Sequence, residues 1–245
     1  MADRAAIVTG ASSGIGLAVA RMLAEDGHAV TMVARRPAKL EAACDALRAD
    51  GLEVQQIAAN VGDEADIKRV VTTHREIYGR LDVLMNNAGV GIGAPIGELD
   101  TKRLDIQLAT NLRSIPLFYR EALQMLTAAG AEHRNALVVN TASIAGKQGQ
   151  AWLSVYSATK FGVVGFTQAM NQELSALGIK STALCPGFVD TAMTEFVRDS
   201  VAPEAMIQTS DIVASVRMLL SLSPGCLIGE IIFQRPGDSG LDAIG

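Results

Sequence analysis

The sequence predicts an α/β protein built on one doubly wound parallel β-sheet of about seven strands, with helices on both faces. Short apolar runs alternate with stretches of helical periodicity along all 245 residues, a rhythm that indicates strands joined by crossover helices. Hydrophobic residues make up 49% of the chain, enough for the core that such a sheet buries. No linker, repeat or low-complexity tract interrupts the pattern, so residues 1–245 are expected to form a single domain.

Seven apolar runs have the length and residue types of buried strands. They span 5–9, 29–34, 53–58, 81–87, 136–142, 180–186 and 230–234. Helical patterns separate them at 16–27, 37–50, 64–79, 100–112, 114–129, 154–177 and 210–221. Strands that are joined through helices are expected to run parallel, with right-handed crossovers.

The first strand is followed by a glycine-rich turn, TGASSGIG, which opens the first helix. Glycines let the backbone turn tightly and approach a pyrophosphate, to which the helix N-terminus offers free N–H groups. The serine hydroxyls add donors for phosphate oxygens. The spacing G-x3-G-x-G also fits a plain strand-to-helix turn, but its position favours a Rossmann-type dinucleotide site. The predicted cofactor contacts here are Gly10, Ser12, Ser13, Gly14 and Ile15.

The second strand ends in Arg35 and Arg36, at the position that usually distinguishes NAD from NADP. An acidic residue there would accept hydrogen bonds from the ribose of NAD, whereas arginine pairs with the 2′-phosphate of NADP. The sequence therefore favours NADP(H), with NAD(H) as the alternative cofactor. Two solvated arginines on an exposed turn are the competing interpretation.

Two further strand ends carry residues that suit a nucleotide. Asn60 and Val61 follow the third strand, where an amide side chain can hydrogen-bond an adenine edge. Asn87, Ala88 and Gly89 end the fourth strand; the asparagine can tie neighbouring strands together, and the small residues leave room for a ribose. Ligands bind beyond the carboxyl ends of parallel strands, although asparagine and glycine are also ordinary turn residues.

Tyr156 and Lys160 are four residues apart in the stretch SVYSATK, so they share one face of the predicted helix. A free phenol has a pKa of about 10, too high for ready proton exchange at neutral pH. A nearby ammonium stabilises the phenolate and lowers that pKa, as does a positive nicotinamide ring. Tyr156 is therefore a candidate general acid or base, with an exposed helix pair that has no chemistry as the alternative.

Ser143 and Asn111 favour the catalytic interpretation. Ser143 ends the fifth strand at the same edge of the sheet, where its hydroxyl can polarise the carbonyl that Tyr156 protonates. Asn111 lies where one helical segment gives way to another, and its side chain can hold a water that connects Lys160 to solvent. A turn role for the serine and a helix kink at the asparagine remain open.

In this order and spacing, the motifs resemble the short-chain dehydrogenase/reductase family. The resemblance rests on TGASSGIG, NNAG, Asn111, Ser143 and Tyr156-x3-Lys160. It includes CPGFVDTAM at 185–193, which looks like the family's Pro-Gly segment beside the nicotinamide, and it extends over about residues 5–233.

The resemblance implies hydride transfer between nicotinamide C4 and a carbonyl or alcohol carbon. Tyr156 would be the general acid/base, and Lys160 would lower its pKa and hold the cofactor ribose. Ser143 would stabilise the substrate oxygen, and Asn111 would hold the relay water. Four residues would position the nicotinamide carboxamide: Pro186, Gly187, Val189 and Thr191. A homo-oligomer, either tetramer or dimer, packed through the Tyr-Lys helix and the last strand, is also implied.

Three features depart from the family pattern. Asn60 stands where the family more often has Asp, at the position expected to contact adenine. Ser13 stands where many NADP-preferring members carry a basic residue, so NADP binding would rest mainly on Arg35 and Arg36. The C-terminal stretch IGEIIFQRPGD matches only loosely the family's Thr-Gly…Asp-Gly-Gly ending.

The segment 191–203 is expected to form a mobile cover over an apolar pocket. The predicted substrate contacts are Ser143, Ile144, Trp152, Tyr156, Met193 and Phe196, with Val197 as a further apolar neighbour. Packing is the alternative role for Trp152. These side chains favour an apolar ketone, aldehyde or secondary alcohol as the small-molecule substrate, without identifying it.

Charge and composition argue against other kinds of partner. A net charge of -5 disfavours nucleic acid, and no apolar stretch reaches the ~18 residues of a membrane span. The N-terminus lacks the apolar run of a signal peptide. The three cysteines and three histidines have no metal-ligand spacing, so no metal site is expected and the histidines are expected to be satisfied or exposed. The expected location is the cytoplasm.

Three rival functions remain open. A 3-oxoacyl-thioester reductase shares these motifs and would need a basic patch for its acidic carrier protein, for which Arg113, Arg120 and Arg198 are candidates. A non-catalytic NADP-sensing regulator would not need an intact catalytic set. A methyltransferase that uses S-adenosylmethionine would usually carry an acid after the second strand, where this chain has two arginines.

Overall fold

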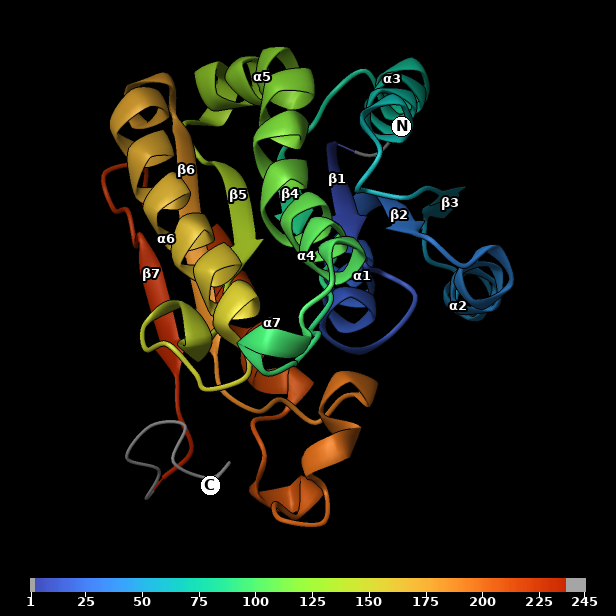
Figure 1. The fold of residues 1–245 in the computed structure, drawn as a ribbon. Coiled ribbons are helices and arrows are strands. Elements are labelled where there is room, and N and C mark those ends of the chain that lie inside the picture. Colours follow the sequence, from blue (N-terminus) through green and yellow to red (C-terminus); the bar gives the residue numbers. More distant parts are fainter. Residues whose placement is uncertain (1–2, 237–245) are drawn as a thin grey trace.

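A seven-stranded parallel sheet runs through residues 3–236, the part of the chain that this computed structural model describes. The strand order is β3-β2-β1-β4-β5-β6-β7, which confirms the predicted doubly wound, Rossmann-type sheet (Figure 1). The strands are β1 (Arg4–Thr9), β2 (His28–Ala34), β3 (Val54–Ala58), β4 (Val83–Asn86), β5 (Ala136–Thr141), β6 (Ile179–Pro186) and β7 (Glu230–Phe233). The end of the atypical C-terminal stretch, from residue 237 onward, lies outside the described residues.

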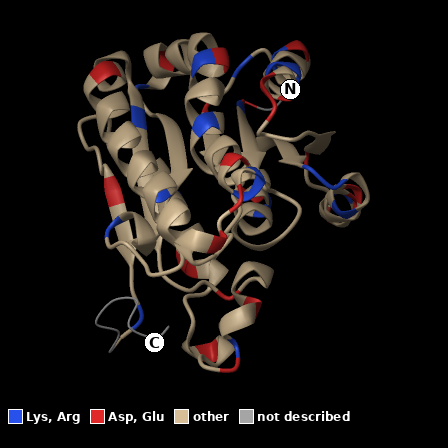
Figure 2. Cartoon of the chain, in the orientation of Figure 1, with Lys and Arg blue, Asp and Glu red and all other residues tan. Residues whose placement is uncertain are grey.

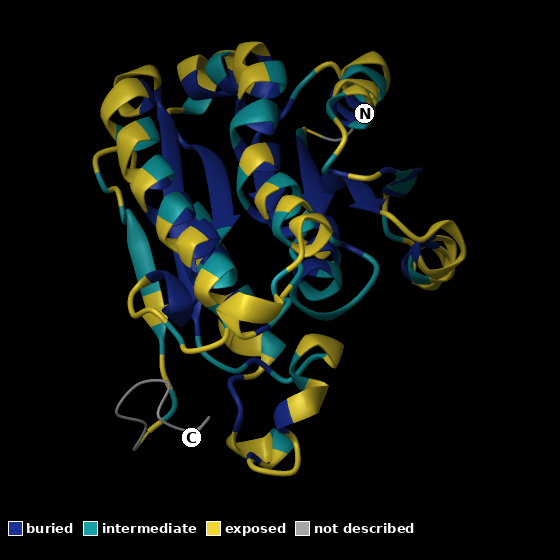
Figure 3. Ribbon diagram, in the orientation of Figure 1, coloured by how far each residue is buried: buried dark blue, intermediate teal, exposed yellow. Residues whose placement is uncertain are grey.

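The helices of this part of the chain form two layers around the sheet. They are α1 (Gly14–Glu25), α2 (Pro37–Ala49), α3 (Glu64–Tyr78), α4 (Thr101–Gln107), α5 (Ser114–His133), α6 (Ser154–Leu174) and α7 (Thr209–Ser221). Helices α3, α5 and α6 share one core cluster with the sheet, and α1, α2 and α7 share the other. Figure 3 shows the buried sheet between helices whose outer faces are exposed. Because both faces are covered, a strand such as β2 is buried along its whole length.

The winding of the sheet changes direction at β1, whose two neighbours are β2 and β4. Thr9, the last residue of β1, joins this switch point: its hydroxyl accepts the N–H groups of Asn87 at 2.9 Å and Ala88 at 3.0 Å. The same hydroxyl donates to the carbonyl oxygen of Met85 at 3.3 Å. The glycine turn after β1 and the NNAG turn after β4 therefore lie side by side, where ligands bind in such folds.

The helical region between β4 and β5 differs from a regular pair of helices. Helix α4 leads into a π-helical segment, Leu108–Arg113, which continues into α5. The sequence predicted that one helical segment gives way to another at Asn111, and in the structure Asn111 lies in this π-helical segment between α4 and α5. Wider helical turns of this kind are rare and occur often at functional sites.

The segment after β6 lies beyond the carboxyl ends of the strands (orange in Figure 1) and is largely exposed (Figure 3). It contains two short 3₁₀ helices that the sequence did not predict, Ala192–Val197 and Pro203–Ala205. Val197 packs with Val201 and Met206 in a small core of the segment's own. The expectation that Val197 adds to the substrate wall is therefore wrong.

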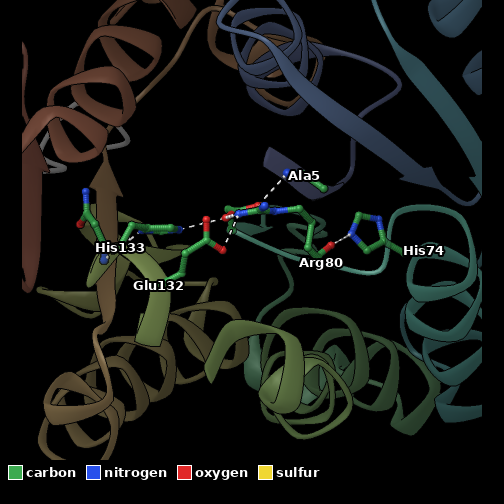
Figure 4. Close-up of polar contacts among 7 residues, drawn as sticks. Ala5, His74, Arg80, Glu132 and His133 are labelled. Atoms are coloured by element: carbon green, nitrogen blue, oxygen red, sulfur yellow. Dashed lines mark hydrogen bonds and ion pairs between the residues drawn. The ribbon is translucent and has the colours of Figure 1, made fainter. Parts of the chain in front are cut away.

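A polar cluster lies at the amino edge of the sheet, around Asp82, which is 1% exposed and precedes β4 (Figure 4). Arg80 donates to both carboxylate oxygens, at 2.9 and 2.7 Å. The N–H of Ala5 donates at 2.8 Å, and His133 Nε2 donates at 2.9 Å. Four donors thus surround one buried carboxylate, and we call this group the Asp82 cluster.

His74 lies next to the Asp82 cluster and is fully buried. Its Nε2 atom donates to the carbonyl oxygen of Arg80 at 2.9 Å (Figure 4), so Nδ1 accepts from the Thr31 hydroxyl at 2.7 Å. Thr31 in turn accepts from Gln55 at 2.7 Å. Burial lowers the pKa of His74 to about 4, so the ring is neutral at pH 7. His74 and His133 are therefore satisfied structural histidines, as expected.

Residues 3–236 contain no candidate membrane span and no candidate cluster of metal ligands. No helix there combines the length and apolar character needed to cross a membrane. No three His, Cys, Asp or Glu side chains in that range are grouped as metal ligands.

Candidate active site

Four predicted catalytic residues converge at the carboxyl edge of the sheet. Tyr156 and Lys160 lie in the first two turns of α6, and Ser143 follows β5 as the N-cap of the short helix Ile144–Gly146. Asn111 lies in the π-helical segment, which packs against α6. Elements far apart in the sequence therefore bring these side chains to one place.

Lys160 is a buried cation without a carboxylate partner in the described structure. It is 4% exposed, and its Nζ atom donates to the carbonyl oxygen of Thr141 at 2.7 Å. The same atom lies 5.5 Å from the centre of the Tyr156 ring. Burial lowers the pKa of Lys160 to about 8. A lysine held this way loses its charge more easily than an exposed one, which is frequent at functional sites.

The Tyr156 phenol is held beside Ser143. Desolvation raises its pKa above the ordinary value, and the hydrogen bond with the Ser143 side chain acts in the opposite direction. The Ser143 hydroxyl also accepts the N–H of Ala145 at 3.1 Å and lies 3.4 Å from the carbonyl oxygen of Pro186. The two hydroxyl groups can therefore act on one substrate oxygen placed between them.

Asn111 clamps the backbone of the loop after β4. Its Oδ1 atom accepts the N–H of Val90 at 2.8 Å, and its Nδ2 atom donates to the carbonyl oxygen of Val90 at 2.8 Å. Nδ2 also donates to the Thr159 hydroxyl at 3.3 Å. Both Nδ2 hydrogens are used, so a relay water would have to bind the remaining lone pair of Oδ1 or the Asn111 backbone carbonyl.

Gly89 keeps a space between Asn111 and Lys160. A Cβ atom built on Gly89 would lie 3.4 Å from Asn111 Oδ1 and 3.7 Å from Lys160 Nζ. Any larger residue would fill the gap between these two polar atoms. Glycine at this position thus leaves open space between Lys160 and Asn111.

The glycine turn between β1 and α1 is as tight as predicted. A Cβ atom on Gly10 would lie 2.8 Å from Asn87 Nδ2, and one on Gly16 would lie 2.4 Å from the Gly10 carbonyl oxygen. Gly10 and Gly14 also have positive φ angles of 67° and 56°, which other residues rarely adopt. The turn therefore requires glycine for its own packing as well as for a ligand.

The start of α1 suits an anionic group. Ser12, Ser13 and Ile15 are partly exposed, and the Ser13 side chain does not cap the helix. No acidic residue lies in the first turn. The first N–H groups of a helix have no partner within it, and the helix dipole favours negative charge there. These features fit the pyrophosphate of a dinucleotide.

Arg35 and Arg36 directly follow β2, and both are exposed. Neither side chain has an ion pair or hydrogen bond within residues 3–236. Two adjacent guanidinium groups without carboxylate partners suit a phosphate, which they can bind through paired N–H donors. Both side chains are thus available to bind the 2′-phosphate of NADP, as the sequence predicted.

Asn60 and Val61 follow β3 and differ in their surroundings. Asn60 is exposed; its Oδ1 atom accepts the N–H of Gly62 at 3.2 Å, and its own N–H donates to Asp66 at 2.7 Å. The Nδ2 group makes no hydrogen bond within the described residues. Val61 is buried in the core, so a cofactor contact there would have to come from its backbone.

The Pro-Gly segment connects the catalytic serine to the glycine turn. It comprises Pro186, Gly187, Val189 and Thr191. Pro186 lies beside Ser143, as the 3.4 Å contact of the hydroxyl shows. At the other end, a Cβ atom built on Gly14 would lie 3.1 Å from Thr191 Cγ2. The segment therefore extends from the neighbourhood of Ser143 to the glycine turn.

The predicted apolar wall divides into one buried and three exposed side chains. Ile144 is 8% exposed, whereas Trp152, Met193 and Phe196 are 40%, 52% and 59% exposed. The Trp152 and Phe196 rings meet edge to face, with centroids 6.3 Å apart. Two of the three exposed side chains, one from each segment, are therefore in contact with each other.

Three contacts of the catalytic residues could not be read from the sequence. The Thr141 carbonyl oxygen holds Lys160, and a Cβ atom on Gly146 would lie 2.7 Å from the Lys160 backbone. A Cβ atom on Gly91 would lie 3.9 Å from the ring of Tyr156. Glycines in loops were the only sequence signal, and they do not show which side chain packs against them.

The three arginines considered for a carrier-protein patch all have carboxylate partners. Arg113 and Arg120 both pair with Glu64, at 3.2 and 2.7 Å. Arg198 follows the short helix Ala192–Val197 in the segment 191–203, which we call the cover segment, and pairs with Asp190 at 2.9 Å. Figure 2 shows Lys and Arg mixed with Asp and Glu along the helices. The three arginines therefore do not form one basic surface.

Comparison with known proteins agrees with this site. The sequence profile of the family described as short chain dehydrogenase matches residues 4–202. The putative ketoacyl reductase of the monensin polyketide synthase from Streptomyces virginiae is 44% identical over 201 residues, covering 82% of this chain and 76% of that protein. A 3-oxoacyl-(acyl-carrier-protein) reductase from Staphylococcus aureus is 31% identical over 243 residues, covering 96% and 97%.

The fold also matches a solved structure along nearly its whole length. A variant of actinorhodin polyketide ketoreductase, crystallised with NADPH, superposes with a TM-score of 0.85 and 33% identity, covering 95% of this chain and 97% of that one. Sequence profile, relatives and fold agree with the motifs at the carboxyl edge of the sheet. The chain belongs to the short-chain dehydrogenase/reductase family of NAD(P)-dependent oxidoreductases that act on carbonyl groups.

Proposed function

We propose that the protein is an NADP-preferring carbonyl reductase in which Tyr156 is the general acid. The observation that carries this proposal is the buried Lys160, which lies beside Tyr156 without a carboxylate partner in the described structure. Burying an unpaired cation destabilises a fold. Lys180 is buried in a similar way, so the feature that distinguishes Lys160 is the Tyr156 ring beside it. The serine, asparagine and glycine turn around it supply the other groups that the reaction needs.

The chain's own residues position and protonate the substrate carbonyl. When bound, the nicotinamide cofactor supplies the hydride to the carbonyl carbon. Ser143 donates a hydrogen bond to the carbonyl oxygen, and Tyr156 transfers its phenolic proton to that oxygen as negative charge develops there. The Lys160 ammonium, 5.5 Å from the ring centre, stabilises the phenolate that remains. The reverse reaction uses the same groups to remove a proton from an alcohol.

Reprotonation of Tyr156 would follow the gap beside Gly89. Lys160 Nζ and Asn111 Oδ1 lie on either side of this gap, so one water molecule there would receive hydrogen bonds from Lys160. The clamp of Asn111 on Val90 keeps the amide fixed. The relay assigned to Asn111 therefore depends on a rigid side chain whose remaining acceptor lies near the lysine.

The preference for NADP rests on Arg35 and Arg36. Their exposed, carboxylate-free position at the end of β2 suits a 2′-phosphate. We expect Arg35→Asp to raise the KM for NADPH by about tenfold or more, because a favourable charge is replaced by a repulsive one. The KM for NADH should change much less. An unchanged KM for NADPH in this variant would contradict the assignment.

One experiment tests the reaction itself. Ketones, aldehydes and secondary alcohols are screened by nicotinamide absorbance, with NADPH or NADP compared with NADH or NAD. Tyr156→Phe removes only the proton donor and should lower turnover by about 10²–10⁴-fold. Wild-type turnover in this variant would contradict the mechanism. Tight NADP binding without turnover of any compound would favour the non-catalytic sensor.

A narrower candidate substrate is the ketone of a 3-oxoacyl thioester. The relatives named as ketoacyl reductases favour it. The pairing of Arg113, Arg120 and Arg198 with carboxylates speaks against a carrier-protein surface made of these three residues. Comparing a 3-oxoacyl chain on a small thiol with the same chain on a carrier protein separates the two: a carrier-dependent enzyme shows a much lower KM for the second.

We also infer that the enzyme works as a homo-oligomer in the cytoplasm. Phe161 on α6 and Ile232 on β7 are 46% exposed each, and they lie on the two elements that the family resemblance places at subunit contacts. Light scattering coupled to size exclusion tests this: a dimer or tetramer mass is expected, and a monomer of 25.7 kDa would contradict it.

A further inference from the structure

Trp152 has a strained backbone conformation, which contacts with neighbouring residues have to stabilise. Its φ angle is +50°, in the left-handed region that a bulky residue rarely adopts. The N–H of Ala94 donates to the Trp152 carbonyl oxygen at 2.8 Å, which joins the loop after β4 to the loop before α6. The strained residue therefore lies at a fixed point next to the catalytic helix.

Gly93 provides the place that the Trp152 ring occupies. A Cβ atom built on Gly93 would lie 1.7 Å from both Cε3 and Cζ3 of the indole. The φ angle of Gly93 is not among the positive ones of the chain, so the backbone alone does not require glycine. The position of the Trp152 ring explains the absence of a side chain at residue 93.

The Trp152 indole also meets the cover segment, residues 191–203. Trp152 and Phe196 pair edge to face at 82°, an arrangement that aromatic rings favour. Phe196 is 59% exposed on the short helix Ala192–Val197, so little else holds it. The Trp152–Phe196 pair therefore connects the cover segment to the loop that precedes Tyr156 by one helical turn.

We propose that Gly93, Trp152 and Phe196 form a gate that determines which carbonyl compounds reach Tyr156. A Cβ atom built on Gly91, in the same loop as Gly93, would lie 3.9 Å from the Tyr156 ring, so this loop passes beside the proton donor. With the rings paired, small ketones pass, whereas a ketone with a bulky apolar body has to separate them and then packs against both. This inference rests on the proposed function, since it concerns the size of the compound that is reduced.

A double-mutant cycle tests the role of Gly93. Gly93→Ala pushes the indole aside, and we expect it to change kcat/KM for a bulky apolar ketone about tenfold relative to a small one. In the background of Trp152→Ala, the same substitution should have almost no effect, because the ring that clashes is gone. Equal effects of Gly93→Ala with and without Trp152 would overturn the proposal. The melting temperature and the Kd for NADPH report any loss of folding.

Fluorescence tests the gate without turnover. Trp152 is the single tryptophan of the chain, so its emission reports this ring alone. Phe196→Ala should increase quenching of Trp152 by acrylamide at least about twofold, since the covering ring is removed. Ile77→Ala, which truncates an exposed apolar side chain on α3, serves as the control and should leave quenching unchanged. Equal quenching in wild type and Phe196→Ala would overturn the pairing.

The two measurements also separate this proposal from the proposed function. Suppose that ketones are reduced and Tyr156→Phe is inactive, but Phe196→Ala and Trp152→Ala leave the preference for small over bulky ketones unchanged. The gate proposal is then wrong, whereas the proposed carbonyl reductase function is supported. If no carbonyl compound is turned over while quenching responds to Phe196→Ala, the ring pair stands. In that case the carbonyl reductase and the gate's role in selecting its substrates both fail.

Discussion

Two buried charged groups at opposite edges of the sheet differ in the partners that surround them. At the amino edge, the Asp82 carboxylate receives hydrogen bonds from Arg80, His133 and the Ala5 backbone. At the carboxyl edge, Lys160 donates to one backbone carbonyl and has no carboxylate beside it in the described structure. The two groups are similarly buried, at 1% and 4% exposure.

The difference shows which of the two groups serves the fold. A buried charge with a full set of partners recovers much of its desolvation cost. Burial raises the pKa of Asp82, but the hydrogen bonds from Arg80, Ala5 and His133 outweigh it, so the pKa lies below its ordinary value. For Lys160, burial dominates and the pKa falls to about 8. The first charge stabilises the native state, whereas the second destabilises it, which supports our proposal that Lys160 serves the reaction.

The largest expected effect is on turnover, at the carboxyl edge. Lys160→Met removes the charge that stabilises the Tyr156 phenolate, and kcat/KM should fall by about 10²–10⁴-fold. Lys180→Met is the matched control, because Lys180 is 6% exposed and donates to the Ser223 carbonyl oxygen at 2.7 Å. The control should retain turnover within about threefold per folded molecule. A similar loss in both variants would show that burial of any lysine, not this position, matters.

The next effect is on stability, at the amino edge. Asp82→Asn removes the buried carboxylate and leaves Arg80 only its 3.3 Å ion pair with the exposed Glu132. Breaking a buried pair costs about 3–5 kcal/mol, and because Arg80 is 27% exposed we expect a loss at the lower end, about 3 kcal/mol. Urea denaturation should show this loss, while turnover per folded molecule stays near that of the wild type. A variant that is as stable as the wild type would mean that the four hydrogen bonds of Asp82 contribute little.

A smaller effect concerns acid. The folded pKa of His74, about 4, lies below that of a free histidine at about 6.5, so the unfolded chain binds the proton first. The contribution of neutral His74 is present above pH 6.5 and is lost as the pH falls towards 4, by up to about 3 kcal/mol. Unfolding free energies between pH 7.5 and 4.5 should show this slope. His74→Gln should flatten it, and an unchanged slope would assign the acid sensitivity to other groups.

The fold, and the meeting of the four candidate catalytic side chains at one edge of the sheet, could be predicted because their signals are local. Strand ends and helical spacing placed Ser143, Tyr156 and Lys160 at one edge of the sheet, and the break between helical segments marked Asn111. Each of these inferences needs only the sequence around one element and the rule that parallel strands end together.

The contacts that decide how these residues behave are not local. Asp82 and His133 are 51 residues apart, and the loop of Gly93 meets Trp152 only in the folded chain. The lack of a carboxylate beside Lys160 is a property of its whole surroundings. The Val197 side chain was misjudged for the same reason, since an apolar residue beside a site packs inward as readily as it faces a ligand. Val61 is also buried, which leaves only its backbone for the predicted cofactor contact.

Thermal melting of Lys160→Met beside the wild type at pH 7 tests the central contrast most directly. If Lys160 is an unpaired buried cation kept for catalysis, methionine in its place should raise the melting temperature or leave it unchanged although turnover is lost, because an apolar side chain of similar length is cheaper to bury. A fall in melting temperature as large as that of Asp82→Asn would contradict this interpretation. It would show that Lys160 stabilises the folded protein.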